Sequence, residues 1–128
     1  MRDPVALSTF TAARLDWAKL AVQEHAAMLD WYRRILGVRR TRLWPVLHRL
    51  HAHGGRFEVV GKAELRVQWE GFGCVLRLAL NLGDTVGSAV ADDGSERLWL
   101  EGGIDEEGRL LPWTAWWSLR HESPTRSI

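Results

Sequence analysis

Apolar side chains recur at helical spacing in the first third of the chain. Between residues 24 and 40 they form one stripe, and most charged side chains lie off it, which predicts an amphipathic helix. Arg39 and Arg40 near its end suit the negative pole of the helix dipole. The stripe consists of Met28, Trp31, Tyr32, Ile35 and Leu36.

The segments on either side of this helix have weaker patterns. In residues 10–22 the apolar positions fit no single helical face, so we expect a loop or irregular N-terminal segment over residues 1–23. Pro45 is compatible with the first turn of a short helical segment that runs through His51. The following glycines end the helical part of the chain, which we place at residues 24–53.

After Gly55 the pattern changes from helical to alternating, which predicts about six short strands. Successive strands joined by short turns favour antiparallel pairing. The expected class is therefore α+β, an N-terminal helical segment followed by a small antiparallel β-sandwich at residues 54–120, with a disordered tail at 121–128. The expected strands cover residues 56–60, 63–70, 74–80, 85–90, 97–100 and 113–119.

The turn between the two most clearly alternating strands can be predicted from their register. A three-residue loop would mix apolar and polar side chains on each face. A two-residue loop of Gly71 and Phe72 instead keeps the apolar side chains on one face, as a half-buried sheet requires. In this register Trp69 lies opposite Cys74. Glycine at the first loop position also suits a type II′ turn.

Composition excludes several classes of protein. Of 128 residues, 17 are Lys or Arg and 16 are Asp or Glu, and the formal net charge of +1 argues against binding to nucleic acid or to an anionic membrane through overall charge. Cys74 is the one cysteine, which excludes an internal disulfide and a cysteine-cluster metal site. No apolar run reaches the roughly 18 residues of a membrane span, and no signal-peptide stretch follows Met1, so we expect a cytoplasmic protein.

Tryptophan is unusually frequent, with eight residues against three phenylalanines and one tyrosine. Its side chain is large and apolar with one polar N–H, so it suits a core, an interface or a sugar-stacking surface. Core packing is the simplest interpretation of each one, but eight in a short chain suggest that some face a partner. Trp116 is a candidate, because alternation places it on the opposite face of its strand from Trp113 and Trp117.

Candidate metal ligands and nucleophiles are few. His48, His51 and His53 lie close together, but no cysteine or acidic cluster accompanies them, and a basic, solvated helix end is the simpler interpretation. Cys74 is expected on the inward side of the hairpin, where a thiol is usually inert. No nucleophile-elbow or phosphate-loop motif occurs, so we expect neither a metal nor a cofactor.

Two runs of charge have simple interpretations. The acidic residues 105–107 are flanked by glycines and are typical of a solvated turn. The arginines between residues 33 and 42 fit the solvated face and end of the helix, or salt bridges to a neighbouring domain. The residues alone thus predict an α+β domain with no evident active site.

The order of segments resembles the C-terminal region of one enzyme family. The matching segments are Asp3-Pro4, Thr9-Phe10, Arg14-Leu15-Asp16-Trp17, residues 25–29, residues 31–36, Arg39-Arg40, Pro45-Val46-Leu47, Leu80-Asn81-Leu82-Gly83-Asp84 and Leu111-Pro112-Trp113. Together they extend over nearly the whole chain, from Asp3 to Leu119. The family is malto-oligosyltrehalose trehalohydrolase, in the α-amylase superfamily of glycoside hydrolases. Several segments recur in related α-amylase-type enzymes, and the Leu-Asp-Trp element ahead of the helix makes the trehalohydrolase the best match.

The resemblance implies a place for each part of the chain. The helix would be the last helix of a catalytic (β/α)₈ barrel, the strands would form the β-sandwich that follows it, and residues 3–22 would match the loop before that helix. The full-length enzyme hydrolyses the α-1,4 bond next to the terminal trehalose of maltooligosyl trehalose. Because barrel active sites lie at this end of the strands, Asp16 and Trp17 are candidates for lining the substrate cleft, with a structural loop anchor as the alternative.

The catalytic machinery of that family has no counterpart in this sequence. Such hydrolysis needs a carboxylate nucleophile and a carboxylic general acid roughly 5 Å apart. Members of the superfamily carry them in motifs that contain Asn-His, Gly-x-Arg-x-Asp and His-Asp, and none of these motifs occurs here. No catalytic residue is therefore carried over, and we predict a structural role in which the chain alone releases no trehalose.

Two other roles remain open. A carbohydrate-binding module would stack exposed tryptophans such as Trp116 on the glucose rings of a maltooligosaccharide. An interaction protein would use the apolar stripe of Met28, Trp31, Tyr32 and Ile35, which in the family would pack on a barrel. We therefore expect a complex with a catalytic barrel or self-association through this stripe.

Overall fold

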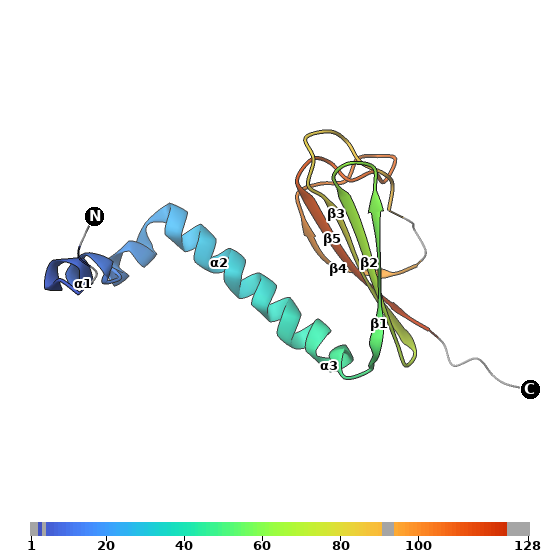
Figure 1. Ribbon diagram of the computed structural model, residues 1–128, viewed down its shortest axis with the longest axis horizontal. Helices are drawn as coiled ribbons and strands as arrows, with labels where there is room; N and C mark the ends of the chain where they lie inside the picture. The colour runs from blue at the N-terminus through green and yellow to red at the C-terminus, as the bar shows by residue number, and fades with distance from the viewer. Residues whose placement is uncertain (1–2, 4, 91–93, 123–128) are drawn as a thin grey trace, which may run out of the picture. The chain divides into compact units, whose positions relative to one another are not determined.

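The structure is a computed structural model that describes residues 3, 5–90 and 94–122 (Figure 1). Most of the tail expected at 121–128 lies outside the described residues. The chain forms two compact units, residues 1–36 and 37–128, and the boundary between them falls within the longest helix. In the described part of the chain, no helix is long and apolar enough to span a membrane.

The first unit is helical. It contains the helix α1 (Leu7–Ala13), the 3₁₀-helix η1 (Trp17–Ala21) and most of α2 (Gln23–Val38). The sequence predicts a loop or irregular segment over residues 1–23, but α1 and η1 lie there. The N-cap residue of α1 is Ala6, no side chain caps the helix, and its first turn has no acidic residue. The usual sequence signals of a helix start are therefore missing from α1.

Helix α2 confirms the predicted amphipathic helix, but none of its residues is buried. The side chains of Met28, Tyr32 and Leu36 are 56%, 53% and 53% exposed. The rings of Trp31 and Tyr32 contact each other edge to face, with centroids 4.9 Å apart. The apolar stripe thus lies open along α2.

The second unit is an antiparallel sheet preceded by two short helical turns. The strands are paired in the order β1-β2-β3-β5-β4, and all four pairings are antiparallel. The predicted α+β class with antiparallel strands is therefore confirmed. The elements of this unit are the π-helical turn η2 (Arg39–Leu43), α3 (Trp44–Leu47), β1 (Leu50–Val60), β2 (Glu64–Gly71), β3 (Cys74–Asn81), β4 (Glu96–Glu101) and β5 (Thr114–His121).

The first strand begins earlier than the sequence analysis placed it. The helical part was predicted to run through His51, but α3 ends at Leu47 and β1 starts at Leu50. The two glycines at 54 and 55 lie inside β1, where its register with β2 shifts between Leu50 and Gly55. His53 has a φ of 64° at this irregularity. The glycines therefore mark a bulge within a strand and not the end of a helix.

Residues 85–90, where a strand was expected, do not form one of the five strands. This segment makes one isolated β-bridge, between Ala89 and Arg109. A second bridge joins Ile104 to Leu110. Leu110 is fully buried against residues of the sheet. In the described residues, the layer over one face of the sheet is therefore built from the connections between strands and not from a further set of strands.

The sheet has an apolar core on each face, because neighbouring residues of a strand point to opposite sides. On one face, Leu76 and Leu119 pack with Val46 of α3, and Trp69 stacks on Trp117 with ring centroids 5.8 Å apart. On the opposite face, the buried residues are Ala79, Leu110 and Trp116.

The turn between β2 and β3 differs from the predicted one. Gly71 pairs with Cys74, so the two loop residues are Phe72 and Gly73, and the register is shifted by two positions. The predicted apolar face is preserved because a shift of two keeps every side chain on its side. Gly73 has a φ of 65°, which glycine adopts at little cost. The Arg49 carbonyl accepts from the Phe72 N–H at 2.8 Å.

Candidate functional site

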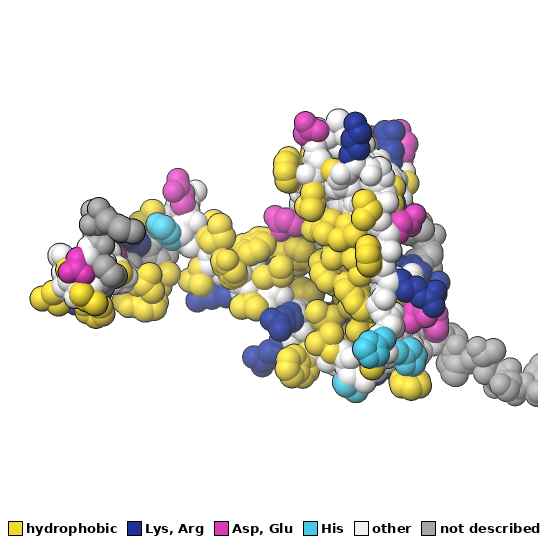
Figure 2. All heavy atoms as spheres, viewed as in Figure 1, with side chains coloured by type: hydrophobic (Ala, Val, Ile, Leu, Met, Phe, Trp, Pro, Cys, Tyr) yellow, Lys and Arg dark blue, Asp and Glu magenta, His cyan; other side chains and the backbone are white. Residues whose placement is uncertain are grey.

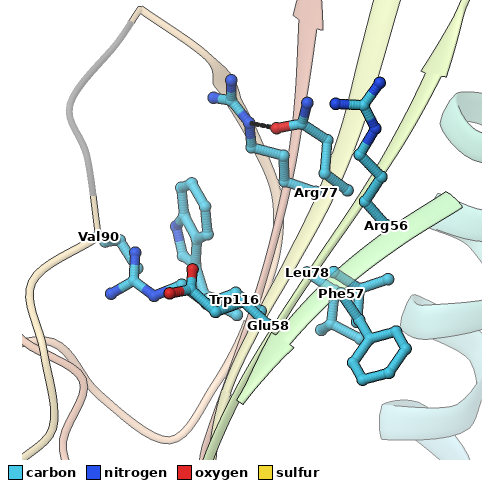
Figure 3. A pocket seen from close by; sticks show the side chains of 11 residues that line it. Arg56, Phe57, Glu58, Arg77, Leu78, Val90 and Trp116 are labelled. Atoms are coloured by element: carbon cyan, nitrogen blue, oxygen red, sulfur yellow. Dashed lines mark hydrogen bonds between the residues drawn. The ribbon is translucent and has the colours of Figure 1, made fainter. Parts of the chain in front are cut away.

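A concavity of about 560 Å³ lies in the second unit, over β1, β2 and β3 (Figure 3). The strand register places Arg56, Gln68 and Arg77 next to one another in one row across these strands. Arg77 donates from Nε to Gln68 Oε1 at 3.1 Å and from Nη1 to Ser95 Oγ at 3.4 Å. Gln68 donates to Glu70 at 3.0 Å, and the Arg56 guanidinium lies 3.9 Å from the same carboxylate. These contacts connect the first row of side chains.

The next row of the concavity contains Glu58, Arg66 and Trp116. Glu58 lies opposite Arg66 across β1 and β2, and the row continues through β3 to Trp116 on β5. Arg66 donates from Nη2 to the carbonyl oxygen of Ala89 at 2.7 Å, which ties this row to the segment after β3. Trp116 is 9% exposed, and with Val90 it forms an apolar wall of the concavity.

Charged side chains line this concavity. Its lining includes three arginines, Arg56, Arg66 and Arg77, and one acidic residue, Glu58. A second carboxylate, that of Glu70, lies 3.9 Å from the Arg56 guanidinium and offsets part of this charge. A hollow lined by guanidinium groups attracts anions and can bind an oxyanion with two parallel hydrogen bonds.

Nothing in the sequence pattern singles out these arginines. Alternation placed Arg66 and Gln68 on the polar side of their strand, and Arg77 on the polar side of the next. That pattern is typical of a solvated sheet face. The signal that could have found the site is the pairing of Gln68 with Arg77, which depends on the corrected hairpin register.

The predicted site residues lie in two different places. Asp16 and Trp17 line a smaller concavity of about 380 Å³ within the first unit. Asp16 caps η1 by accepting a hydrogen bond from the Ala18 N–H at 3.1 Å, and the Trp17 side chain is 71% exposed. Trp116 lines the arginine concavity of the second unit, where its indole is largely buried and not an open stacking surface.

The histidines and the cysteine do not assemble a metal site. Figure 2 shows histidine side chains gathered near the start of β1, and His51 packs edge to face on Phe72 with ring centroids 4.5 Å apart. Cys74 is a free, fully buried thiol in the core of the sheet. Within residues 3, 5–90 and 94–122, no group of three or more His, Cys, Asp or Glu side chains could hold a metal ion.

The acidic residues 105–107 form a turn that hydrogen bonds from Arg109 stabilise. Asp105 accepts from the Arg109 backbone N–H at 2.8 Å and from the Arg109 guanidinium at 2.8 Å. It also accepts from the Glu107 backbone N–H at 3.1 Å. These hydrogen bonds, the one from the Arg109 backbone first, lower the pKa of Asp105, and the pKa of Arg109 is raised in return. The turn precedes the buried Leu110 and helps to place it.

Comparison with known proteins gives one informative similarity. Neither a protein-family model nor a curated protein matches the chain. A solved structure of a candidate alpha amylase from Salmonella typhimurium superposes with a TM-score of 0.81 and 25% sequence identity, over 94% of this chain. The chain spans about a fifth (20%) of the length of that protein. The similarity supports a C-terminal-like domain of the α-amylase superfamily and does not single out the trehalohydrolase.

Proposed function

We propose that this chain is a non-catalytic, C-terminal domain that supports a catalytic barrel of the α-amylase superfamily. The observation that carries the proposal is the superposition of 94% of the chain on 20% of an amylase-type protein. The order of the segments, with Asp16-Trp17 ahead of α2 and Asn81 at the end of β3, favours malto-oligosyltrehalose trehalohydrolase as the enzyme concerned. The reaction supported would then be release of trehalose from maltooligosyl trehalose.

Helix α2 supplies the contact surface in this proposal. Met28, Tyr32 and Leu36 lie on one stripe of the helix, and each side chain is more than half exposed. Apolar surface of this kind is stabilised by about 25 cal/mol for each Å² removed from water. In the proposed assembly α2 is the last helix of the barrel, so the barrel covers this stripe.

The second unit also has an exposed apolar surface that a partner could cover. Phe57 and Val59 on β1 are 75% and 64% exposed, although valine and phenylalanine usually lie inside. They share one face of the strand because they are two residues apart. The two units therefore each carry an uncovered apolar surface, which is typical of a domain that packs on another.

Sedimentation velocity with a barrel chain tests the assembly. The chain is mixed with the catalytic barrel of a malto-oligosyltrehalose trehalohydrolase that lacks its own C-terminal region, and a 1:1 complex is expected. The M28S/Y32S/L36S variant should weaken this complex at least tenfold. A control, Glu106→Gln, changes an exposed charged residue in a turn of the second unit, outside α2, and should leave the affinity unchanged. Absence of a complex, or equal affinity of the two variants, would contradict the proposal.

Two assays on the chain alone separate this role from the others. Incubation with maltooligosyl trehalose should release no trehalose, and turnover by chain free of contaminating hydrolase would overturn the non-catalytic role. Tryptophan fluorescence during titration with maltooligosaccharide should stay flat at millimolar sugar. A saturable change would favour a carbohydrate-binding module, in which an exposed tryptophan such as Trp17 would stack on the sugar.

A further inference from the structure

Strand β1 forms one edge of the five-stranded sheet. It lies at one end of the strand order and, in the part of the chain that the structure describes, β2 is the strand that pairs with it (Figure 1). Its first half is irregular, because the register with β2 shifts between Leu50 and Gly55. Over residues 55–60 the pairing is regular, so the outer side of this segment presents backbone N–H and C=O groups in strand geometry. Such an edge can accept a further strand.

The opposite edge of the sheet, β4, offers a shorter regular segment. This strand has six residues, and its register with β5 shifts between Arg97 and Trp99. Its first residue, Glu96, forms an ion pair with Arg42. Bulges and charged contacts of this kind are common devices that keep an edge from pairing. The regular half of β1 is therefore the edge better suited to an added strand.

The side chains of this half of β1 are exposed and alternate between charged and apolar. The side chain of Arg56 is 78% exposed, and Glu58 is also exposed. Phe57 and Val59 are 75% and 64% exposed. One cation and one anion thus lie two residues apart on one face of the strand, and two apolar side chains lie on the other face.

This pattern is complementary to itself in one register. Two antiparallel copies of β1 are related by a two-fold axis at one residue position, and an axis at Arg56 or at Glu58 would place that charge opposite its own copy, which is unfavourable. An axis at Phe57 instead places Arg56 of each copy opposite Glu58 of the other. Directly opposed Cβ atoms are about 5 Å apart, so two ion pairs and one contact between the Phe57 rings can form. On the ring side, Val59 of each copy lies opposite Gly55 of the other, where no side chain obstructs it.

The surroundings of the two charges agree with this register. Glu58 lies opposite Arg66 on β2, and the Arg56 guanidinium lies 3.9 Å from the Glu70 carboxylate. In the paired sheet one row would contain Arg66, then Glu58, then Arg56 of the second copy. The sign of the charge therefore alternates along the row, and each exposed charge keeps its present neighbour when it gains a partner.

We propose that two copies of this chain associate through β1, in an antiparallel pairing centred on Phe57 that joins their sheets into one continuous sheet. Because the paired segment is short, the dimer is weak, with a dissociation constant of about 1–100 µM. This association goes beyond the proposed support of a barrel, which uses the stripe of α2, and does not depend on it.

Sedimentation velocity of the chain alone, from about 5 to about 500 µM, should show a monomer that converts to a dimer as the concentration rises. Arg56→Glu and Glu58→Arg each place like charges opposite one another twice, so each variant alone should dimerise at least tenfold more weakly. An equimolar mixture of the two variants regains both ion pairs and should dimerise within about threefold of the wild type. A monomer at every concentration, or a mixture that dimerises no better than either variant, would overturn the proposal.

The α2 variant M28S/Y32S/L36S is the control for the surface used. It should dimerise as the wild type does even though it is expected to lose the barrel, so the two proposals can fail separately. A dimer that this variant abolishes would assign the association to α2 and contradict pairing through β1.

Cysteine cross-linking tests the register. Cys74 is the one cysteine of the chain and is fully buried, so an introduced thiol is the reactive one. Oxidised glutathione should convert Phe57→Cys into a covalent dimer, because the two copies of position 57 lie directly opposite each other. Val59→Cys is the matched control, since its two copies lie about 14 Å apart, beyond the reach of a disulfide. Absence of a cross-link in Phe57→Cys, or equal cross-linking of both variants, would refute this register.

Discussion

Replacing Asn81 with alanine is expected to destabilise the second unit strongly. Asn81 ends β3 and is 2% exposed, and the two N–H groups on its Nδ2 are shared among three carbonyl oxygens within hydrogen-bond distance. The acceptors are Thr85 at 2.8 Å, Leu110 at 3.1 Å and Leu111 at 3.1 Å. Its Oδ1 accepts from the Gly83 N–H at 3.0 Å. One side chain thus joins the end of a strand to both connecting segments that cover the sheet.

The magnitude follows from the groups that lose a partner. The Leu110 carbonyl keeps its hydrogen bond from the Gly87 N–H, at 2.8 Å. Thr85 is exposed, so water can replace the amide there. Gly83 and Leu111 are half-buried, and each unsatisfied group costs about 1–2 kcal/mol, so the expected loss is about 2–4 kcal/mol of unfolding free energy.

Equilibrium unfolding in urea, followed by tryptophan fluorescence at 25 °C and pH 7, measures this loss. Leu82→Ala is a matched control, because the neighbouring side chain is 53% exposed and should change the free energy by no more than about 0.5 kcal/mol. Asn81→Asp keeps the shape but replaces the donor with a carboxylate that faces carbonyl oxygens. It should be at least as unstable as Asn81→Ala at pH 7 and recover in part when acid protonates the carboxylate.

The reasoning is refuted if Asn81→Ala unfolds within about 0.5 kcal/mol of the wild type with an unchanged urea slope. Such a result would mean that water or a rearranged loop satisfies the exposed backbone groups at no cost. The connecting segments would then be placed by the burial of Leu110 and not by the amide.

Three further predictions concern stability. A Cβ at Gly71 would lie 2.4 Å from the Arg49 carbonyl oxygen, so Gly71→Ala should cost about 2 kcal/mol or more. Nothing lies within 4 Å of a Cβ at Gly37, so Gly37→Ala in α2 should raise the free energy of unfolding by about 0.5–1 kcal/mol. Thermal melts in which Gly71→Ala is more stable than Gly37→Ala would contradict the close approach of Gly71 to Arg49. Asp105→Asn tests the turn: because Arg109 lowers the folded-state pKa of Asp105, its stabilisation is complete above about pH 4 and is lost as the pH falls through that lowered value. The difference in melting temperature between wild type and Asp105→Asn should therefore shrink in acid, and a constant difference from pH 7 to pH 2 would disprove the linkage.

Local patterns predicted the elements where one face of the chain is apolar. The stripe of α2 and the alternation of β2 and β3 depend only on the periods of a helix and a strand, so spacing in the sequence is enough to find them. The same argument fails for α1, which has neither a capping side chain nor a buried residue. It also fails at Gly54 and Gly55, because the bulge in β1 depends on the pairing with β2.

The hairpin shows the limit of reasoning from register. Side chains alternate with a period of two, so pairings that differ by two residues place the same side chains on the same faces. The choice between them was made by the left-handed conformation of Gly73 and by the hydrogen bonds of Arg49 with the turn. Arg49 lies far from the turn in the sequence, and its contribution is visible only in the fold.

The sequence by itself determined the amphipathic helix, the one-sided strands and the order of segments that resembles an amylase-type C-terminal region. Only the tertiary structure decided that Arg56, Arg66 and Arg77 share one concavity with Trp116. The reason is physical. A repeating pattern reports which side of its own element a residue faces, whereas a concavity depends on which strands pair and which segment covers them, and those contacts join residues far apart in the chain.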